Sequence, residues 1–534
     1  MKFLIRAACC AVSLASLAGC GAAGSPIPCE DDSKCLRYAI TADIPILDPH
    51  LSELPEAGMV FRQIYDTLLY RDSEHHQFMP SLATDWEVSP DGLQYTFHLR
   101  RDVSFHDGSP FRAAAVARNV ERIFQPGAVT SLAKQLLGPL HKVEVLDDHT
   151  IRLHLFEPHA ALLDGLAQPY LGIASAEALA SNDELHYQYH QSGTGPFVLE
   201  DYLPGERILL RRFDAYGLER LGYSSLAGDE INRVEFSILG DGENDLLSVL
   251  GNTQDVVDTV SPAAARNLTG NSRVKLLPIS IPGLTIHWLF NTERDPLAKR
   301  EVRSALLLAS NRIAISNQIY LNTAAIAWSP LSESSGYAHT GLRNVFEYDL
   351  AQARALLSEA GYADSDGDGI LDLAGEMLEL KVLAPPWGQL PEAAAFLRDE
   401  WRRIGVNVVV EPVPGKTQLA NLIRTGAYDL IPVREHGIDP GILGRVYSDN
   451  SAYWPARAQY PALNEMLRQA AQEIDPASRR AQYYTIQALL MNEALLLPIS
   501  EYVRLRAVSA KVVGLRYDAY GFYPLLAGVR IAAD

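Results

Sequence analysis

The spacing of apolar residues changes from that of a strand to that of a helix within residues 85–124. In the stretch DWEVSPDGLQYTFHLR, apolar side chains alternate from Trp86 to Leu99 around the turn SPDG, which predicts a β-hairpin with one buried face. After a second turn at Asp107 and Gly108, apolar residues return at helical spacing. These helix positions are Val116, Val120, Ile123 and Phe124. The two patterns together predict a small α+β unit.

Later segments alternate helix and strand. Asp349 is placed to cap a helix that stops before Gly361. The next helix, with Ala393, Leu397, Trp401 and Ile404 on one face, precedes the strand VNVVVEPV. This order favours a partly parallel sheet, so the predicted fold class is α/β with a mixed α+β subdomain. At 534 residues the chain is too long for one core, and we expect two or three domains.

Charge and composition narrow the class of partner. The formal net charge is −19, and 48% of residues are hydrophobic and 21% charged, as in ordinary globular proteins. An acidic chain without basic runs should repel phosphate backbones, so we expect no nucleic-acid partner.

The pattern of residues at the N-terminus is typical of an export signal. Lys2 and Arg6 precede an apolar run, residues 7–18, of about a dozen residues. Because a membrane-spanning helix needs about 20 apolar residues and no later run qualifies, we expect export without a span. The residues Leu17-Ala18-Gly19-Cys20 resemble the lipobox of bacterial lipoproteins, which implies that Cys20 is acylated and becomes the first mature residue. An ordinary signal peptide with an incidental cysteine is the alternative.

The remaining cysteines fit an oxidising compartment. Cys9 and Cys10 leave with the signal, so that Cys29 and Cys35 are the pair left in the mature chain besides Cys20. We infer one small disulfide between them. The chain has no GxSxG elbow, HExxH motif or phosphate loop, and no thiol remains for catalysis. An exported hydrolase is therefore the weaker alternative, and we expect no enzyme activity.

Several blocks, in order, resemble a known family. They are LATDWEVSPDGLQYTFHLRRDVSFHDGSPF, GTGPFVLEDYLPGERILLRR, LFNTERDPLAKREVRSALLLASNR, YDLAQARALLSEAGY, WRRIGVNVVVEPV and YDLIPVREHGIDP. The chain is similar through them to the bacterial extracellular solute-binding proteins of the oligopeptide, dipeptide and nickel class (family 5), which serve ABC importers. The resemblance implies a bilobal periplasmic-binding-protein-like fold, with an extra subdomain inserted in the first lobe and a hinge that closes on ligand.

The resemblance also implies a division of the chain. We expect a lipoprotein signal peptide (1–19), a tether (20–35), lobe I in two parts (36–80 and 192–282) around an inserted subdomain (81–191), lobe II (283–502), and a return to lobe I (503–534).

Family members contact ligand from loops that line the interlobe cleft. Carried over, these loops place Asp48, Trp387 and Trp454 near the ligand, together with Arg434, Glu435, His436 and Asp439 in REHGIDP. Peptide-binding members tend to carry an aspartate where His436 stands, and this aspartate pairs with the peptide's amino group. A buried ammonium without a carboxylate costs several kcal/mol, so Glu435 would have to substitute. Arg434 offers a fork for a carboxylate.

One acidic stretch has the spacing of a calcium loop. Asp364, Asp366 and Asp368 alternate before Gly369, but the twelfth position is Gly375 instead of a carboxylate. A polar surface turn is the main expectation and a structural calcium the alternative. We expect no other metal and no cofactor.

The expected function is capture of a solute for an ABC importer at the membrane surface. The expected partners are a small-molecule or peptide ligand, the permease subunits and, through the lipid on Cys20, the membrane. We expect a monomer on the periplasmic or extracellular face. The ligand stays open between short peptides, opine-like or amino-sugar compounds, oligosaccharides and chelated nickel or haem. A tethered chaperone or a ligand sensor on the same scaffold is the alternative function.

Overall fold

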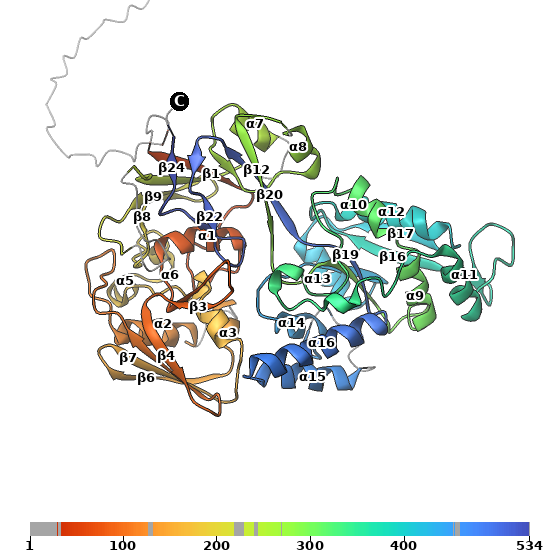
Figure 1. Cartoon of the computed structure of the whole chain (residues 1–534), viewed down its shortest axis with the longest axis horizontal. Helices are drawn as coiled ribbons and strands as arrows, with labels where there is room; N and C mark the ends of the chain where they lie inside the picture. The colour runs from red at the N-terminus through yellow and green to blue at the C-terminus, as the bar shows by residue number, and fades with distance from the viewer. Residues whose placement is uncertain are drawn as a thin grey trace, which may run out of the picture.

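The computed structural model describes residues 29, 34–125, 132–217, 229–239, 244–268, 270–451, 453 and 460–532. Two lobes lie side by side and are joined by extended chain (Figure 1). The expected signal segment, Cys20 and Trp454 fall outside the described residues. The α/β fold class and the bilobal architecture agree with the prediction.

Lobe I is built on a seven-stranded sheet in the order β12-β20-β11-β1-β10-β9-β8. Its strands are β1 (Cys35–Ile40), β8 (Phe197–Leu203), β9 (Arg207–Arg212), β10 (Arg233–Ile238), β11 (Val256–Val257), β12 (Val274–Ser280) and β20 (Val503–Ser509). β1 runs parallel to β10 and β11, whereas β20 pairs antiparallel with both β11 and β12. The C-terminal part of the chain therefore completes the first lobe.

A smaller α+β unit, below the main sheet in Figure 1, forms the rest of this lobe. Its four-stranded sheet has the order β4-β5-β7-β6, with β4 (Ala83–Val88), β5 (Gln94–Leu99), β6 (Leu140–Asp147) and β7 (Thr150–Leu155). The predicted hairpin is present, and Trp86 lies opposite Phe97. Val88 is 40% exposed although Tyr95, opposite it, is buried, because β4 is the edge strand of this sheet, so the expected apolar face is incomplete on β4. The predicted helix is α2 (Ala113–Ile123), which buries Val116, Val120 and Ile123.

Lobe II has a five-stranded sheet in the order β17-β16-β18-β13-β19. Its strands are β13 (Ile286–Phe290), β16 (Glu379–Ala384), β17 (Asn407–Pro412), β18 (Leu430–Val433) and β19 (Leu496–Ser500). β16 is parallel to β17 and β18, as the strand and helix order predicted. α12 (Leu390–Arg402) buries Ala393, Leu397 and Trp401, and Asp349 caps α11 (Leu350–Glu359) through the amides of Ala351 and Gln352.

The remaining elements complete both lobes. Lobe I and its smaller unit contain α1 (Pro55–Ile64), α3 (Leu132–Leu137), α4 (Leu162–Leu166), η2 (Pro169–Leu171), α5 (Ala176–Ser181), α6 (Glu184–Tyr187), α7 (Asn244–Leu250), α8 (Pro262–Asn267), β2 (Leu69–Arg71), β3 (Phe78–Pro80), β21 (Val512–Val513), β22 (Arg516–Tyr517), β23 (Pro524–Leu525) and β24 (Arg530–Ile531). Lobe II contains α9 (Arg300–Leu308), α10 (Arg312–Gln318), η4 (Glu333–Ser335), η5 (Thr340–Leu342), α13 (Lys416–Thr425), α14 (Ile442–Tyr447), α15 (Pro461–Gln472), α16 (Pro476–Asn492), β14 (Asp372–Leu373) and β15 (Glu376–Met377).

The chain crosses between the lobes in two neighbouring segments. One follows β12 and the other precedes β20, and the amide of Ile281 donates to the carbonyl of Tyr502 at 2.8 Å. The strands of the second sheet thus lie between residues 286 and 500, within the span expected for lobe II. Cys29 and Cys35 are joined in a disulfide at the start of β1. Within the described residues, no helix combines the length and apolarity that spanning a membrane requires.

Candidate functional site

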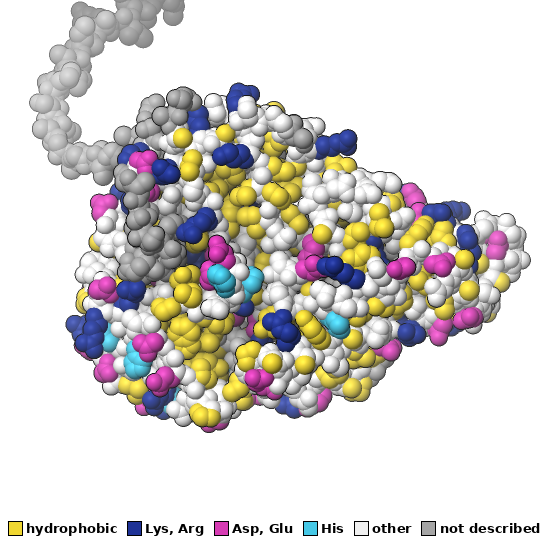
Figure 2. Space-filling model, viewed as in Figure 1, with side chains coloured by type: hydrophobic (Ala, Val, Ile, Leu, Met, Phe, Trp, Pro, Cys, Tyr) yellow, Lys and Arg dark blue, Asp and Glu magenta, His cyan; other side chains and the backbone are white. Residues whose placement is uncertain are grey.

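A groove separates the two lobes on one face of the molecule, with acidic and basic side chains along its margins (Figure 2). The loop that follows β18, residues 434–440, reaches from lobe II toward lobe I at this junction. Ile438 is fully buried and belongs to the apolar core of lobe I, although β18 belongs to lobe II. The predicted contact loop is therefore part of the interface between the lobes.

The backbone of this loop is held by the first crossing segment. Leu284 N donates to Glu435 O at 2.9 Å, and Gly437 N donates to Pro282 O at 2.9 Å. Gly283, between these bonds, has φ +137°, and a Cβ there would lie 2.6 Å from the Cα of His436. Only glycine permits the two backbones to approach so closely.

Arg434 presents a cation between two aromatic rings. Its Cζ lies 5.3 Å from the ring centroid of Trp387 and 5.4 Å from that of Tyr502, within cation–π range. Its side chain is exposed and forms no ion pair with any described residue. A guanidinium held in place by stacking, with its fork open, suits a planar anion.

The negative charge of Glu435 is only weakly balanced by nearby cations. Its side chain is 28% exposed, and its partner among the described residues is Arg445, with Oε2 3.9 Å from Nη1. Burial raises the pKa of Glu435, and Glu53 from lobe I adds to the rise, although Arg445 and Arg434 oppose it. Glu435 therefore has capacity for an additional cation.

His436 faces lobe I. Its ring centroid is 4.5 Å from that of Phe522, which in turn lies under the guanidinium of Arg504 at 4.9 Å. Burial, followed by the charges of Arg445, Arg434 and Arg504, lowers the pKa of His436 to about 3. The imidazole is neutral at physiological pH, so it offers no negative charge to a bound amine.

Asp439 is engaged in an ion pair within the protein, and its contact with ligand stays a prediction. Its two carboxylate oxygens accept from Nη1 and Nη2 of Arg479 at 2.7 and 2.8 Å, and Oδ1 also accepts from Gly441 N. Burial alone would raise the pKa of Asp439, but Arg479 holds it below the usual value. Its carboxylate stabilises the loop.

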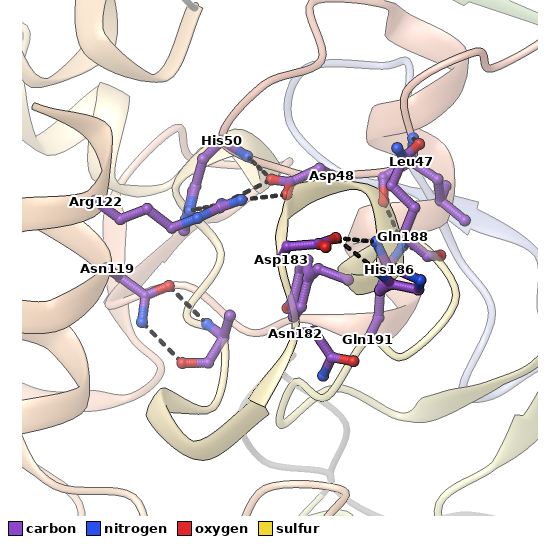
Figure 3. A network of polar contacts seen from close by, with 12 residues as sticks. Leu47, Asp48, His50, Asn119, Arg122, Asn182, Asp183, His186, Gln188 and Gln191 are labelled. Carbon is purple, nitrogen blue, oxygen red and sulfur yellow. Dashed lines mark hydrogen bonds and ion pairs between the residues drawn. The ribbon is translucent and has the colours of Figure 1, made fainter. Parts of the chain in front are cut away.

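Asp48 is likewise committed to an internal ion pair. Figure 3 shows its carboxylate between Arg122 and the backbone of His50. Asp48 Oδ2 lies 2.6 Å from Arg122 Nη2, and Oδ1 accepts from His50 N at 2.9 Å. Because Asp48 is fully buried and both oxygens are occupied, the structure corrects the expectation that it contacts ligand.

The aromatic residues of the site come from distant parts of the chain. Trp387 is half-buried beside Arg434, and its contact with ligand stays a prediction, whereas Trp454 falls outside the described residues. Tyr502 and Phe522 belong to the segment that returns to lobe I, and sequence reasoning missed both. The available signal was the position of Tyr502 at the expected end of lobe II.

The acidic stretch lies apart from the junction. Carboxylate oxygens of Asp364, Asp366 and Asp368 lie within 4.8 Å of one another on an exposed turn. Asp364 accepts hydrogen bonds from the amides of Gly367 and Gly369, as in a polar turn. The structural calcium stays a prediction.

Known proteins resemble this chain over most of its length. The probable ABC transporter periplasmic-binding protein SapA of Escherichia coli strain K12 is 29% identical over 496 residues, which covers 86% of this chain and 85% of SapA. The glutathione-binding protein GsiB of Escherichia coli O157:H7 is 24% identical over 492 residues and covers 88% and 90% of the two chains.

Solved structures share the fold. The dipeptide-binding protein of a Pseudoalteromonas species, in complex with Met-Leu, superposes with a TM-score of 0.77 at 24% identity, covering 93% of this chain and all of that one. NikA of Brucella suis, in complex with Fe(III)-EDTA, gives a TM-score of 0.81 at 21% identity and covers 93% and 99%. The model of the family described as bacterial extracellular solute-binding proteins, family 5 Middle, matches residues 77–450. The chain therefore belongs to the bacterial extracellular solute-binding proteins of family 5.

Proposed function

We propose that this protein is a lipid-anchored, non-catalytic binding protein that captures a small peptide-like or other polar organic solute between its lobes and delivers it to an ABC importer. The observation that supports this proposal is that Arg434 and Glu435, side by side in sequence, present opposite charges at the lobe junction. One offers an open guanidinium between two rings and the other a carboxylate with a distant partner. A solute with both an anionic and a cationic group would satisfy both.

The names of the relatives support this class of cargo. GsiB binds glutathione, the Pseudoalteromonas protein was solved with a dipeptide, and AgaA was solved with agropinic acid. All three ligand types are polar organic solutes. The neutral His436, in place of an aspartate, favours cargo whose amine is met by Glu435.

The binding proposal is tested by thermal shift and by calorimetry with dipeptides, oligopeptides, opines and glycans. A ligand at one hundred times its dissociation constant should stabilise the protein by about 2.7 kcal/mol. Arg434→Ala and Glu435→Ala should each weaken binding of the active compound roughly tenfold or more. A response to glycans alone would contradict a zwitterionic cargo, and unchanged affinity in both variants would remove the loop from the site.

The anchoring part of the proposal rests on the lipobox-like residues before Cys20. Several acyl chains hold a protein firmly at a membrane, and a tether keeps it near its permease. Cys20→Ser should release the protein from the membrane fraction and abolish incorporation of labelled palmitate. An unchanged distribution would leave an ordinary signal peptide as the explanation.

A further inference from the structure

A polar cavity lies in lobe I on the side of the junction opposite the 434–440 loop. It has a volume of about 70 Å³, enough for several water molecules or a small anionic group. Its lining residues are Arg62, Tyr70, Arg71, Asp72, Ser73, Arg516, Asp518 and Leu525. They come from α1, from β2 and the turn after it, and from the C-terminal return, and Figure 1 places β3 and β22 at the margin of lobe I that faces lobe II.

Arg62 is buried with unused hydrogen-bond donors. It is 3% exposed, and its Nη2 donates to Ala167 O at 2.9 Å and to Asp518 Oδ2 at 3.0 Å. Its Nε is buried without a partner, and its Nη1 makes no hydrogen bond with any described residue. The Nε atom is shielded from solvent, so Nη1 is the donor that a guest in the cavity could use if it accepts hydrogen bonds.

Arg71 repeats the pattern from the neighbouring strand. Its side chain is 8% exposed, Nη1 pairs with Asp164, and Nε donates to His76 O at 3.1 Å. Its Nη2 has no hydrogen bond to any described residue. Two buried arginines that line one cavity thus each have a terminal nitrogen that can donate a hydrogen bond to a bound ligand.

The acidic lining residues are already engaged. Asp72 Oδ2 accepts from the amide and from the Nδ1 of His75, at 2.8 and 2.7 Å. Asp518 accepts from Arg62 and from Tyr520 N. The hydroxyls of Tyr70 and Ser73 add further donors. Because Arg62 and Arg71 are each paired with a carboxylate, the cavity has an excess of hydrogen-bond donors rather than of charge, and donors suit the two oxygens of a carboxylate.

The cavity is close to the proposed cargo loop. Burial would lower the pKa of Arg71, but Asp164 and, across the lobe boundary, Asp439 contribute to raising it. Asp439 belongs to the same loop as Arg434 and Glu435, so the cavity and the loop lie on opposite sides of one junction. We propose that this cavity is a carboxylate-binding pocket of lobe I, and that the transported solute places a carboxylate group in it. The second half of this inference rests on the proposed function.

The test uses acetate as the probe and acetamide, its neutral analogue of similar shape, as the control compound. Melting temperature is measured against increasing sodium acetate, with chloride exchanged to hold ionic strength constant. A saturable rise with acetate and none with acetamide is expected. No rise with acetate, or an equal rise with acetamide, would overturn the pocket.

Variants then locate the effect. Arg71→Gln and Arg62→Gln should raise the apparent dissociation constant for acetate at least about tenfold, since each removes a charge-assisted donor. If a glutamine variant fails to fold, Arg71→Lys keeps the charge but loses the fork and should also weaken binding. Arg112→Gln, at an exposed ion pair with Asp148, is the matched control and should respond as the unmodified protein does.

If acetate raises the melting temperature of the Arg62 and Arg71 variants as it does that of the unmodified protein, acetate binds elsewhere and the proposal is overturned. The acetate assay reports on the pocket alone, whereas the Arg434 and Glu435 variants report on cargo capture. If acetate binds but the Arg434 and Glu435 variants capture cargo normally, the proposed function has failed. If those variants lose cargo but acetate does not bind, the pocket proposal has failed.

Discussion

Two aspartates that the family resemblance placed near the ligand form ion pairs inside the protein. Asp48 pairs with Arg122 and Asp439 with Arg479, and each pair takes both carboxylate oxygens. Removing one partner of a buried pair leaves a charge without compensation, which is more costly than the pair itself.

Arg122→Met should therefore lower the free energy of unfolding by about 3–5 kcal/mol, because Asp48 would stay buried without its cation. Urea denaturation followed by circular dichroism measures the change. Arg112→Met, which breaks an exposed pair, should cost no more than about 1 kcal/mol. Equal effects of the two substitutions would contradict the assigned role of Asp48.

The buried imidazole of His287 makes the stability of the protein depend on pH. It is fully buried between Thr285 O and the hydroxyl of Tyr447, and burial lowers its pKa to about 4. In the unfolded chain a histidine binds a proton below about pH 6.5, whereas folded His287 stays neutral until about pH 4. Acid therefore favours the unfolded chain, and this residue's share of stability is lost as pH falls through that window.

The expected loss is on the order of 3 kcal/mol between pH 7 and pH 4. The direct measurement is an NMR titration of the imidazole signals, in which His287 should not titrate above about pH 4.5. His287→Gln, which can still meet the Tyr447 hydroxyl, should show a shallower dependence of unfolding free energy on pH. A midpoint near 6.5 for His287 would refute the neutral assignment.

At the scale of elements, the backbone of the first crossing segment lies very close to that of the 434–440 loop. The closest approach is at Gly283, which has φ +137° and no room for a Cβ. Gly283→Ala should destabilise the protein by about 1–3 kcal/mol and weaken solute binding, since the loop must shift. Gly270→Ala is the control because Gly270 also has positive φ, +81°, but nothing lies within 4 Å of its Cβ position. A larger fall in melting temperature for Gly283→Ala than for Gly270→Ala is expected, and equal falls would mean that the close approach of the two backbones adds no cost.

The elements themselves were predictable where apolar spacing was regular. α2 and α12 bury the residues that their spacing selected, and the hairpin pairs Trp86 with Phe97. The site was less predictable because its partners are remote. Nothing local to Asp48 shows an arginine 74 residues away, and nothing local to His436 shows Phe522. A single sequence gives the type of a side chain, but the fold decides which charge meets it.

At the scale of the whole molecule, the lobes touch at more than one place. Ala160 N donates to Ala471 O at 3.0 Å, and Gln472 Nε2 donates to Glu157 Oε2 at 2.6 Å, so the smaller unit of lobe I meets α15 of lobe II. With Ile438 in the core of lobe I, these contacts describe an approach of the lobes that hinge motion would have to break.

Joining Glu157→Cys and Gln472→Cys with a short bismaleimide should trap a bound solute. The solute that co-purifies with the natively produced protein is quantified by mass spectrometry before and after dialysis. The cross-linked protein should retain several times more than the same variant without cross-linker. Equal loss from both samples would mean that release needs no separation of α15 from the smaller unit of lobe I.

The position of β20 also bears on the order in which the lobes fold. This strand lies between β12 and β11 in the sheet of lobe I, yet it begins at Val503, near the end of the chain. A nascent polypeptide cannot close that sheet until the strands of lobe II have been synthesised. The first lobe thus stays unfinished while the second lobe is being made.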